Sequence, residues 1–122
     1  MKLLIAIPAL DEEKSIESVI ERTLEARAYI CCHSPISEVE ITVVSDGSTD
    51  RTAELAGRHS DQIRVVVFPA NKGYGAAIKE AWRGSDADVL GFLDADGTCD
   101  PKFFSALCER SPGMFFRTVE LG

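Results

Sequence analysis

This 122-residue sequence has little positive charge and no long apolar run. No hydrophobic stretch approaches the roughly 20 residues that cross a membrane as a helix. Lysine and arginine number 13 against 20 acidic residues, and the net charge of −7 argues against nonspecific nucleic-acid binding, which needs basic patches. The same charge argues against adhesion to an acidic membrane surface. An anionic ligand would therefore need local help from a metal ion or from a few basic side chains.

Metal-binding patterns of cysteine and histidine are also missing. The four cysteines contain an adjacent pair but no Cys-x-x-Cys, so neither a zinc site nor a disulfide framework is indicated. A reducing cytoplasm is the location that this usage fits. His33 and His59 stand alone in the sequence, and we expect no ligand role for either.

The residues that are present describe one α/β domain over residues 1–122. Hydrophobic residues make up 45% of the chain, enough to bury a core at this length. Short apolar runs alternate with segments of helical periodicity, which predicts a mostly parallel sheet flanked by helices. Strands are expected over residues 3–7, 41–44, 63–68 and 89–93, with one more from residues 114–121. Helices are expected over residues 12–29, 48–58, 74–82 and 101–107.

One stretch, residues 89–101, suggests chemistry. Its apolar run stops at two carboxylates one residue apart, Asp94 and Asp96. Ligands of open α/β sheets bind at the carboxyl ends of strands, and paired carboxylates there suit Mg²⁺ or Mn²⁺. The spacing alone equally fits an acidic turn that caps the helix after Pro101.

Every predicted strand ends in a polar loop that contains glycine or proline. The loops cover residues 8–13, 45–50, 69–75 and 94–100, and in a parallel sheet all four lie along one edge. Asp46, Asp94 and Asp96 would meet there. Lys72 is also in these loops, but we expect it to be solvated. Tyr74 and Trp82 fall on the predicted buried face of the third helix.

Four motifs in these loops resemble those of family 2 glycosyltransferases. Residues 8–13 (Pro-Ala-Leu-Asp-Glu-Glu) are similar to the opening Pro-x-Tyr-Asn-Glu, and residues 46–50 match Asp-Gly-Ser-x-Asp. Residues 71–75 match Asn-x-Gly-x-Gly, and residues 94–96 form the Asp-x-Asp motif. The order and spacing are closest to polyprenyl- or dolichyl-phosphate sugar synthases. The resemblance implies the Rossmann-like, nucleotide-binding half of a GT-A fold, with about four or five strands.

The resemblance also implies a site for a nucleotide-diphosphate sugar, with GDP or UDP as the nucleotide. Its residues would be Pro8, Leu10, Glu12, Val44, Asp46, Asp94, Ala95 and Asp96. The first three would line the base and ribose pocket, and the next two would contact the base. Asp94 and Ala95 would lie under the ribose and diphosphate. Asp96, with Asp94, would bind a divalent metal, Mg²⁺ or Mn²⁺. No catalytic residue is assigned.

Departures from the family pattern limit what can be carried over. Leu10 stands where an aromatic residue is usual, Asp11 where asparagine is usual, and Ser45 where an aspartate is common. The family continues well beyond the length of this chain with an acceptor site. We therefore expect a domain that is truncated relative to the family, completed by a partner chain or a homo-oligomer. A lipid-phosphate acceptor would place it at the cytoplasmic face of a membrane.

Other functions stay open at this point. The chain could be a nucleotide-binding module without turnover. Residues 94–98 also resemble the signature of haloacid-dehalogenase phosphatases, in which the first aspartate is a nucleophile. That signature normally follows the first strand, whereas here it follows the fourth predicted strand. An EF-hand loop starting at Asp94 would need glycine at Cys99 and glutamate at Ser105, so it does not fit.

Overall fold

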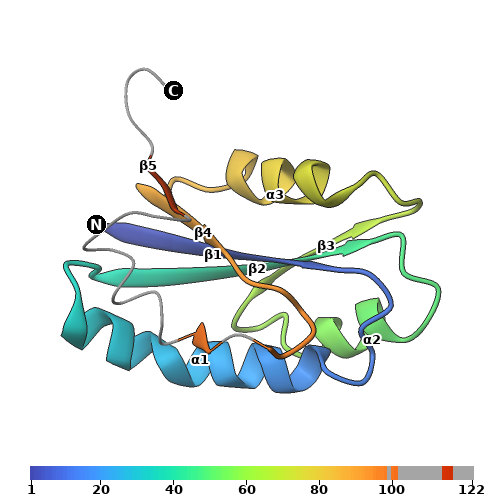
Figure 1. The fold of residues 1–122 in the computed structure, drawn as a ribbon, viewed down its shortest axis with the longest axis horizontal. Coiled ribbons are helices and arrows are strands. Elements are labelled where there is room, and N and C mark those ends of the chain that lie inside the picture. Colours follow the sequence, from blue (N-terminus) through green and yellow to red (C-terminus); the bar gives the residue numbers. More distant parts are fainter. Residues whose placement is uncertain (99, 102–113, 117–122) are drawn as a thin grey trace.

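The sheet is built around strand β1 (Lys2–Ala9), which lies between β2 (Glu38–Asp46) and β4 (Val89–Phe92) and is parallel to both. The computed structural model describes residues 1–98, 100, 101 and 114–116 (Figure 1). Strand β3 (Arg64–Phe68) pairs parallel with β2, and β5 (Met114–Phe116) pairs antiparallel with β4. The strand order is therefore β3-β2-β1-β4-β5. This confirms the predicted α/β class, with its mostly parallel sheet and the additional strand near residue 114.

Helices cover both faces of the sheet (Figure 1). Helices α1 (Ile16–His33) and α2 (Thr52–Gly57) lie on one face, and α3 (Tyr74–Arg83) lies on the other. The side chains of β1 alternate between the two faces of the sheet. Leu3, Ile5 and Ile7 belong to the core cluster under α1, whereas Leu4 and Ala6 belong to the cluster under α3. A strand buried on both faces reads as a continuous apolar run, which is why its sequence shows no polar alternation.

Strand β1 continues through Pro8, where the sequence predicted its end. The backbone carbonyl of Ala6 accepts a hydrogen bond from Leu93 N, so Ala6 faces β4, and Pro8, two residues on, faces the same side. The pairing with β4 ends at Ala6. The missing N–H of Pro8 therefore removes no bond from the sheet.

Helix α1 begins at Ile16 rather than at the predicted residue 12, and it extends to His33. Its buried residues are Ile16, Val19, Ile20, Thr23, Ala26 and Ile30. Residues 12–15 form a turn in which the carbonyl of Glu12 accepts from Ser15 N and Ile16 N, while the N–H groups of Glu12 and Glu13 donate to the side chains of Thr52 and Asp50. Thr23 is accommodated in the core because its hydroxyl donates to the carbonyl of Val19, 2.6 Å away.

The prediction that Tyr74 is buried was wrong. Tyr74 is the first residue of α3 and is 46% exposed, because it lies at the carboxyl edge of the sheet rather than over it. Ala77 and Ala81 form the buried contact of the helix, and Trp82 is half-buried. The helix predicted over residues 101–107 falls, after Pro101, outside the described residues. No helix among the described residues is long and apolar enough to span a membrane.

Candidate functional site

Four strand-end loops meet at the carboxyl edge of the parallel strands. They are residues 10–15 after β1, 47–51 after β2, 69–73 after β3 and 93–98 after β4. The first two are joined by side chains that bind backbone. Asp11 N donates to Ser48 Oγ at 3.1 Å, Glu12 N donates to Thr52 Oγ1 at 2.8 Å, and Asp11 Oδ1 accepts from Thr49 N at 2.8 Å. Bonds of this kind satisfy N–H groups that have no partner at the start of a helix, so they anchor the turn that leads into α1.

Asp46 joins the second loop to the third. Its side chain is 5% exposed, and its two carboxylate oxygens accept hydrogen bonds from Lys72 N at 2.7 Å and Gly73 N at 3.0 Å. The carbonyl of Asp46 also accepts from Asn71 Nδ2 at 3.4 Å. A buried carboxylate is stable in this position because backbone donors replace its lost hydration. Asp46 therefore fixes where the third loop lies.

Two further hydrogen bonds connect the fourth loop to its neighbours. Tyr74 OH, at the start of α3, donates to Asp94 Oδ1 at 3.2 Å. Ser15 Oγ, just before α1, donates to the carbonyl of Ala95 at 2.6 Å. Hydrogen bonds thus connect each loop to the next, and the fourth loop to the first. The four loops form one connected rim, which confirms their predicted convergence on a single edge.

The rim encloses two adjoining cavities. The first, which we call the Asp46 cavity, has a volume of about 280 Å³, and the second, the Asp96 cavity, about 340 Å³. The Asp46 cavity is lined by Pro8, Ala9, Leu10, Asp46, Asn71, Gly73 and Tyr74. The Asp96 cavity is lined by Pro8, Leu10, Glu12, Tyr74, Asp94, Ala95 and Asp96. Because three residues line both, an extended ligand can occupy the two together.

The Asp96 cavity lies at the point where the strand order reverses. Along the chain, β1 is followed by β2 and then β3 on one side, and β4 lies on the other side of β1. Ligands of open α/β sheets bind at such a switch point, outside the carboxyl ends of the strands. The loops after β1 and β4 both contribute to the Asp96 cavity, as this rule requires.

The site is strongly acidic. Glu12, Asp94 and Asp96 line one cavity and Asp46 the other, while no lysine or arginine lines either one among residues that the structure describes. A diphosphate placed here would be repelled unless a cation stood between it and the carboxylates. Carboxylate oxygens are the ligands that Mg²⁺ and Mn²⁺ prefer, so the donor set fits such an ion.

Asp96 accepts two hydrogen bonds from the residue two positions further on. Thr98 donates to Asp96 Oδ1 from its hydroxyl at 2.7 Å and from its backbone N–H at 3.0 Å. These bonds, first the hydroxyl and then the backbone N–H, lower the pKa of Asp96 below its ordinary value. At a carboxylate with a lowered pKa, a cation competes better with protons for the oxygens.

The substitution Thr98→Val is expected to raise the pKa of Asp96 toward the ordinary aspartate value, because it removes the hydroxyl donor and keeps the backbone one. Protons would then displace a cation at higher pH than in the parent chain. Carboxyl-carbon NMR titration of Asp96 measures the shift directly. Thr98→Ser is the matched control, because it retains a hydroxyl. An unchanged midpoint in Thr98→Val would show that the threonine does not set this pKa.

Val44 and Lys72 both lie outside the two cavities. Val44 is fully buried in the core cluster under α3 and lines neither cavity, because β2 is covered on both faces up to its end. Its predicted contact with a base therefore has no support from its position. Lys72 is exposed, as expected, and its Nζ lies 4.5 Å from the centre of the Phe68 ring rather than in a cavity.

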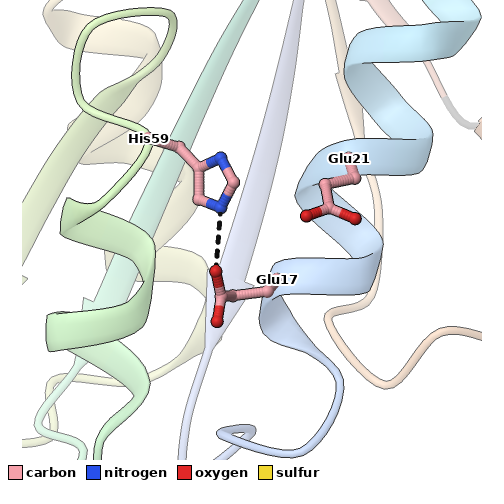
Figure 2. A group of neighbouring side chains, drawn as sticks. All are labelled: Glu17, Glu21 and His59. Carbon is pink, nitrogen blue, oxygen red and sulfur yellow. Dashed lines mark hydrogen bonds and ion pairs between the residues drawn. The ribbon is translucent and has the colours of Figure 1, made fainter.

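A second group of metal-binding side chains lies between α1 and α2. Figure 2 shows Glu17 and Glu21 of α1 facing His59, which follows α2. Their ligand atoms lie within 4.8 Å of one another, and no other group of three or more such residues comes as close in the described part of the chain. His59 Nε2 is 3.2 Å from Glu17 Oε2, and an Arg58 nitrogen is 3.5 Å from the other oxygen. Glu17 thus already has a positively charged partner.

We expected no ligand role for His59, because its approach to Glu17 depends on how two helices pack and is not visible in the sequence. Only the spacing of Glu17 and Glu21, one helical turn apart, was visible. Partly exposed ion pairs of this kind contribute about 0–1 kcal/mol. The group could hold a metal ion, but it lines neither cavity of the rim.

Comparison with known proteins identifies relatives. The family model described as "Glycosyl transferase family 2" matches residues 4–111. A dolichyl-phosphate beta-glucosyltransferase of Trichomonas vaginalis is 34% identical over 94 residues, which are 75% of this chain and 28% of the relative. An undecaprenyl-phosphate 4-deoxy-4-formamido-L-arabinose transferase of Pseudomonas paraeruginosa is 37% identical over 111 residues, 88% of this chain and 31% of the relative. The chain thus spans about a third of the length of these relatives.

Solved structures show the same fold. Glucosyl-3-phosphoglycerate synthase from Mycobacterium tuberculosis, in complex with Mn²⁺, UDP and glucosyl-3-phosphoglycerate, aligns with a TM-score of 0.68 and 27% identity over 90% of this chain and 39% of that one. S. aureus TarS in complex with UDP-GlcNAc aligns with a TM-score of 0.68 and 20% identity, over 89% of this chain and 30% of that one. The predicted GT-A nucleotide-binding architecture is confirmed by this likeness.

Proposed function

Because this chain belongs to glycosyl transferase family 2, we propose that it binds a nucleotide-diphosphate sugar at the rim for transfer of the sugar to a polyprenyl phosphate. The observation that carries the proposal is the connected rim with two adjoining cavities, one of them lined by three carboxylates. The named acceptors of the two relatives, dolichyl and undecaprenyl phosphate, support the choice of acceptor. The solved relative with Mn²⁺ and UDP supports the choice of donor and metal.

The residues of the rim have distinct tasks in this proposal. The nucleoside enters the Asp46 cavity, where Pro8 and Leu10 offer apolar surface. The diphosphate extends into the Asp96 cavity, where Asp94 and Asp96 hold a divalent cation. When bound, such an ion neutralises the charge that develops on the departing nucleoside diphosphate. The bonds from Thr98 lower the pKa of Asp96, so this carboxylate stays ionised to a lower pH.

A phosphate acceptor makes a general base unnecessary in this proposal. A phosphate oxygen is already ionised near neutral pH, so a lipid phosphate can attack the sugar without first losing a proton to a side chain. With a lipid-phosphate acceptor, we predict that the protein acts at the cytoplasmic face of a membrane. Assembly with a partner chain or a second copy is likewise a prediction, and sedimentation of the purified chain measures it.

Calorimetric titration of the chain with UDP and with GDP, each with and without MnCl₂, tests the donor site. We expect one of the two nucleotides to bind at least about 10-fold more tightly with Mn²⁺, since an acidic cavity repels a diphosphate until a cation is present. Equal affinity with and without the metal, or no binding of either nucleotide, would contradict the proposal.

A second assay separates transfer from binding alone. The chain is incubated with a labelled nucleotide sugar and a polyprenyl phosphate, and labelled lipid is extracted. Formation of the labelled lipid supports the transferase, whereas metal-dependent binding with neither transfer nor hydrolysis supports the module without turnover.

A further inference from the structure

Tyr74 occupies a central place in the rim. It is one of three residues that line both cavities, and it is the one aromatic side chain among the described residues that line either. Nearly half of its surface is exposed, although it begins a helix whose next turns are buried against the sheet. A large exposed ring at the junction of two cavities is suited to contact whatever fills them.

The two ends of the Tyr74 side chain are held in place. Its hydroxyl donates to Asp94 Oδ1 at 3.2 Å. Its ring meets the ring of Phe92 edge to face, with centroids 6.1 Å apart and an interplanar angle of 86°. Phe92 is the last residue of β4, so the ring is braced by the strand that leads into the Asp94 loop.

The backbone before Tyr74 is held as well. Gly73 precedes it with a φ of 101°, and the N–H of Gly73 donates to Asp46 Oδ2. Asp46 therefore sets the position from which α3 starts, and the helix start sets the position of Tyr74. A continuous series of contacts runs from the Asp46 carboxylate through Gly73 and Tyr74 to the Asp94 carboxylate.

We propose that Tyr74 is a positioning residue that orients the Asp94 carboxylate for the cation and couples the nucleoside end of the site to its metal end. This inference rests on the proposed function. A phenol donates a single hydrogen bond, so it fixes the carboxylate while leaving most of its acceptor capacity for an ion. Groups that orient a metal ligand in this way usually change metal affinity 10- to 100-fold when removed.

The substitution Tyr74→Phe tests the hydroxyl and keeps the ring. Mn²⁺ affinity, measured from the free-ion EPR signal in the presence of UDP or GDP, is expected to fall by about 10-fold, the lower end of that range because the site is exposed. Affinity for the same nucleotide without metal is expected to stay within about 2-fold. Tyr29→Phe is the matched control, because it removes the hydroxyl of the other tyrosine, on α1, and should change neither quantity.

The substitution Tyr74→Leu tests the ring. It is expected to weaken metal-free nucleotide binding as well, because the surface shared by the two cavities is lost.

Circular dichroism of each variant confirms that the fold is retained. A combined Tyr74→Phe and Asp94→Asn variant is expected to lose no more Mn²⁺ affinity than Asp94→Asn alone, since the hydroxyl acts through that carboxylate.

The outcomes distinguish this inference from the proposed function. Mn²⁺ affinity in Tyr74→Phe equal to that of the parent chain, or full additivity with Asp94→Asn, would overturn the role of Tyr74 and leave the donor site intact. A parent chain that binds neither Mn²⁺ nor either nucleotide would overturn the donor site and the inference together.

Discussion

Replacing Gly47 with alanine is expected to destabilise the chain by about 3 kcal/mol and to displace the loop after β3. Gly47 has a φ of 75°, a conformation that side chains other than glycine rarely adopt. A Cβ built there lies 2.4 Å from Asn71 N and 2.6 Å from the carbonyl carbon of Ala70. Both neighbours are backbone atoms, which cannot rotate away as a side chain can.

The substitution would also disturb the loop after β3. The backbone that must move carries the N–H groups of Lys72 and Gly73, which bind the Asp46 carboxylate. Separating them leaves a buried carboxylate short of donors, which accounts for about 1–3 kcal/mol of the expected loss. We therefore expect nucleotide affinity to fall together with stability.

Urea denaturation measures the change in the free energy of unfolding. Gly57→Ala is the matched control, since Gly57 ends α2 and no heavy atom lies within 4 Å of a Cβ built on it. That control should change stability by no more than about 1 kcal/mol. A Gly47→Ala chain as stable as the control would show that the second and third loops are not packed as described.

Replacing Asp96 with alanine is expected to abolish most of the metal dependence of nucleotide binding, a loss of about 100-fold in Mn²⁺ affinity. Removing a group that only orients a ligand costs 10- to 100-fold, so removing a proposed ligand should cost at least the upper end. The fold should survive, because Asp96 is exposed and its side chain accepts hydrogen bonds from Thr98, two residues along the same loop.

Calorimetry with UDP or GDP, with and without MnCl₂, measures this effect. Asp61→Ala is the control for charge alone, because Asp61 is an exposed aspartate just before β3, at the opposite edge of the sheet. It should leave the metal dependence unchanged. Metal dependence retained in Asp96→Ala would place the cation elsewhere.

The sequence was sufficient to predict the sheet and the edge that carries the site. Strand β1 is visible because burial on both faces makes it uniformly apolar, and its loop is visible because Pro8 and Asp11 interrupt that run. The same reasoning located the carboxylates after β4. Periodicity was less accurate at the ends of elements: among the described residues, Pro8 stays in the strand and α1 starts at Ile16 rather than at residue 12.

Contacts between distant segments could not be predicted from the sequence. The two donors to Asp46 lie 26 and 27 residues away, and the hydroxyl that binds Asp94 lies 20 residues before it. Helical spacing assigned Tyr74 to the core because spacing gives the face of a helix and not how far the helix overhangs the sheet. The base contact of Val44 stays a prediction: Val44 shares a strand face with Asp46, two residues on, but is fully buried in the cluster under α3.

Paramagnetic broadening of backbone amide NMR signals by Mn²⁺ tests the central claim most directly, because the chain offers two places for the ion. With UDP or GDP present, we predict that substoichiometric Mn²⁺ broadens the amides of residues 94–98 and those of Glu12 and Tyr74. The amides around Glu17, Glu21 and His59 should broaden less. Strongest broadening between α1 and α2, with the signals of residues 94–98 unaffected, would contradict the donor site at the rim.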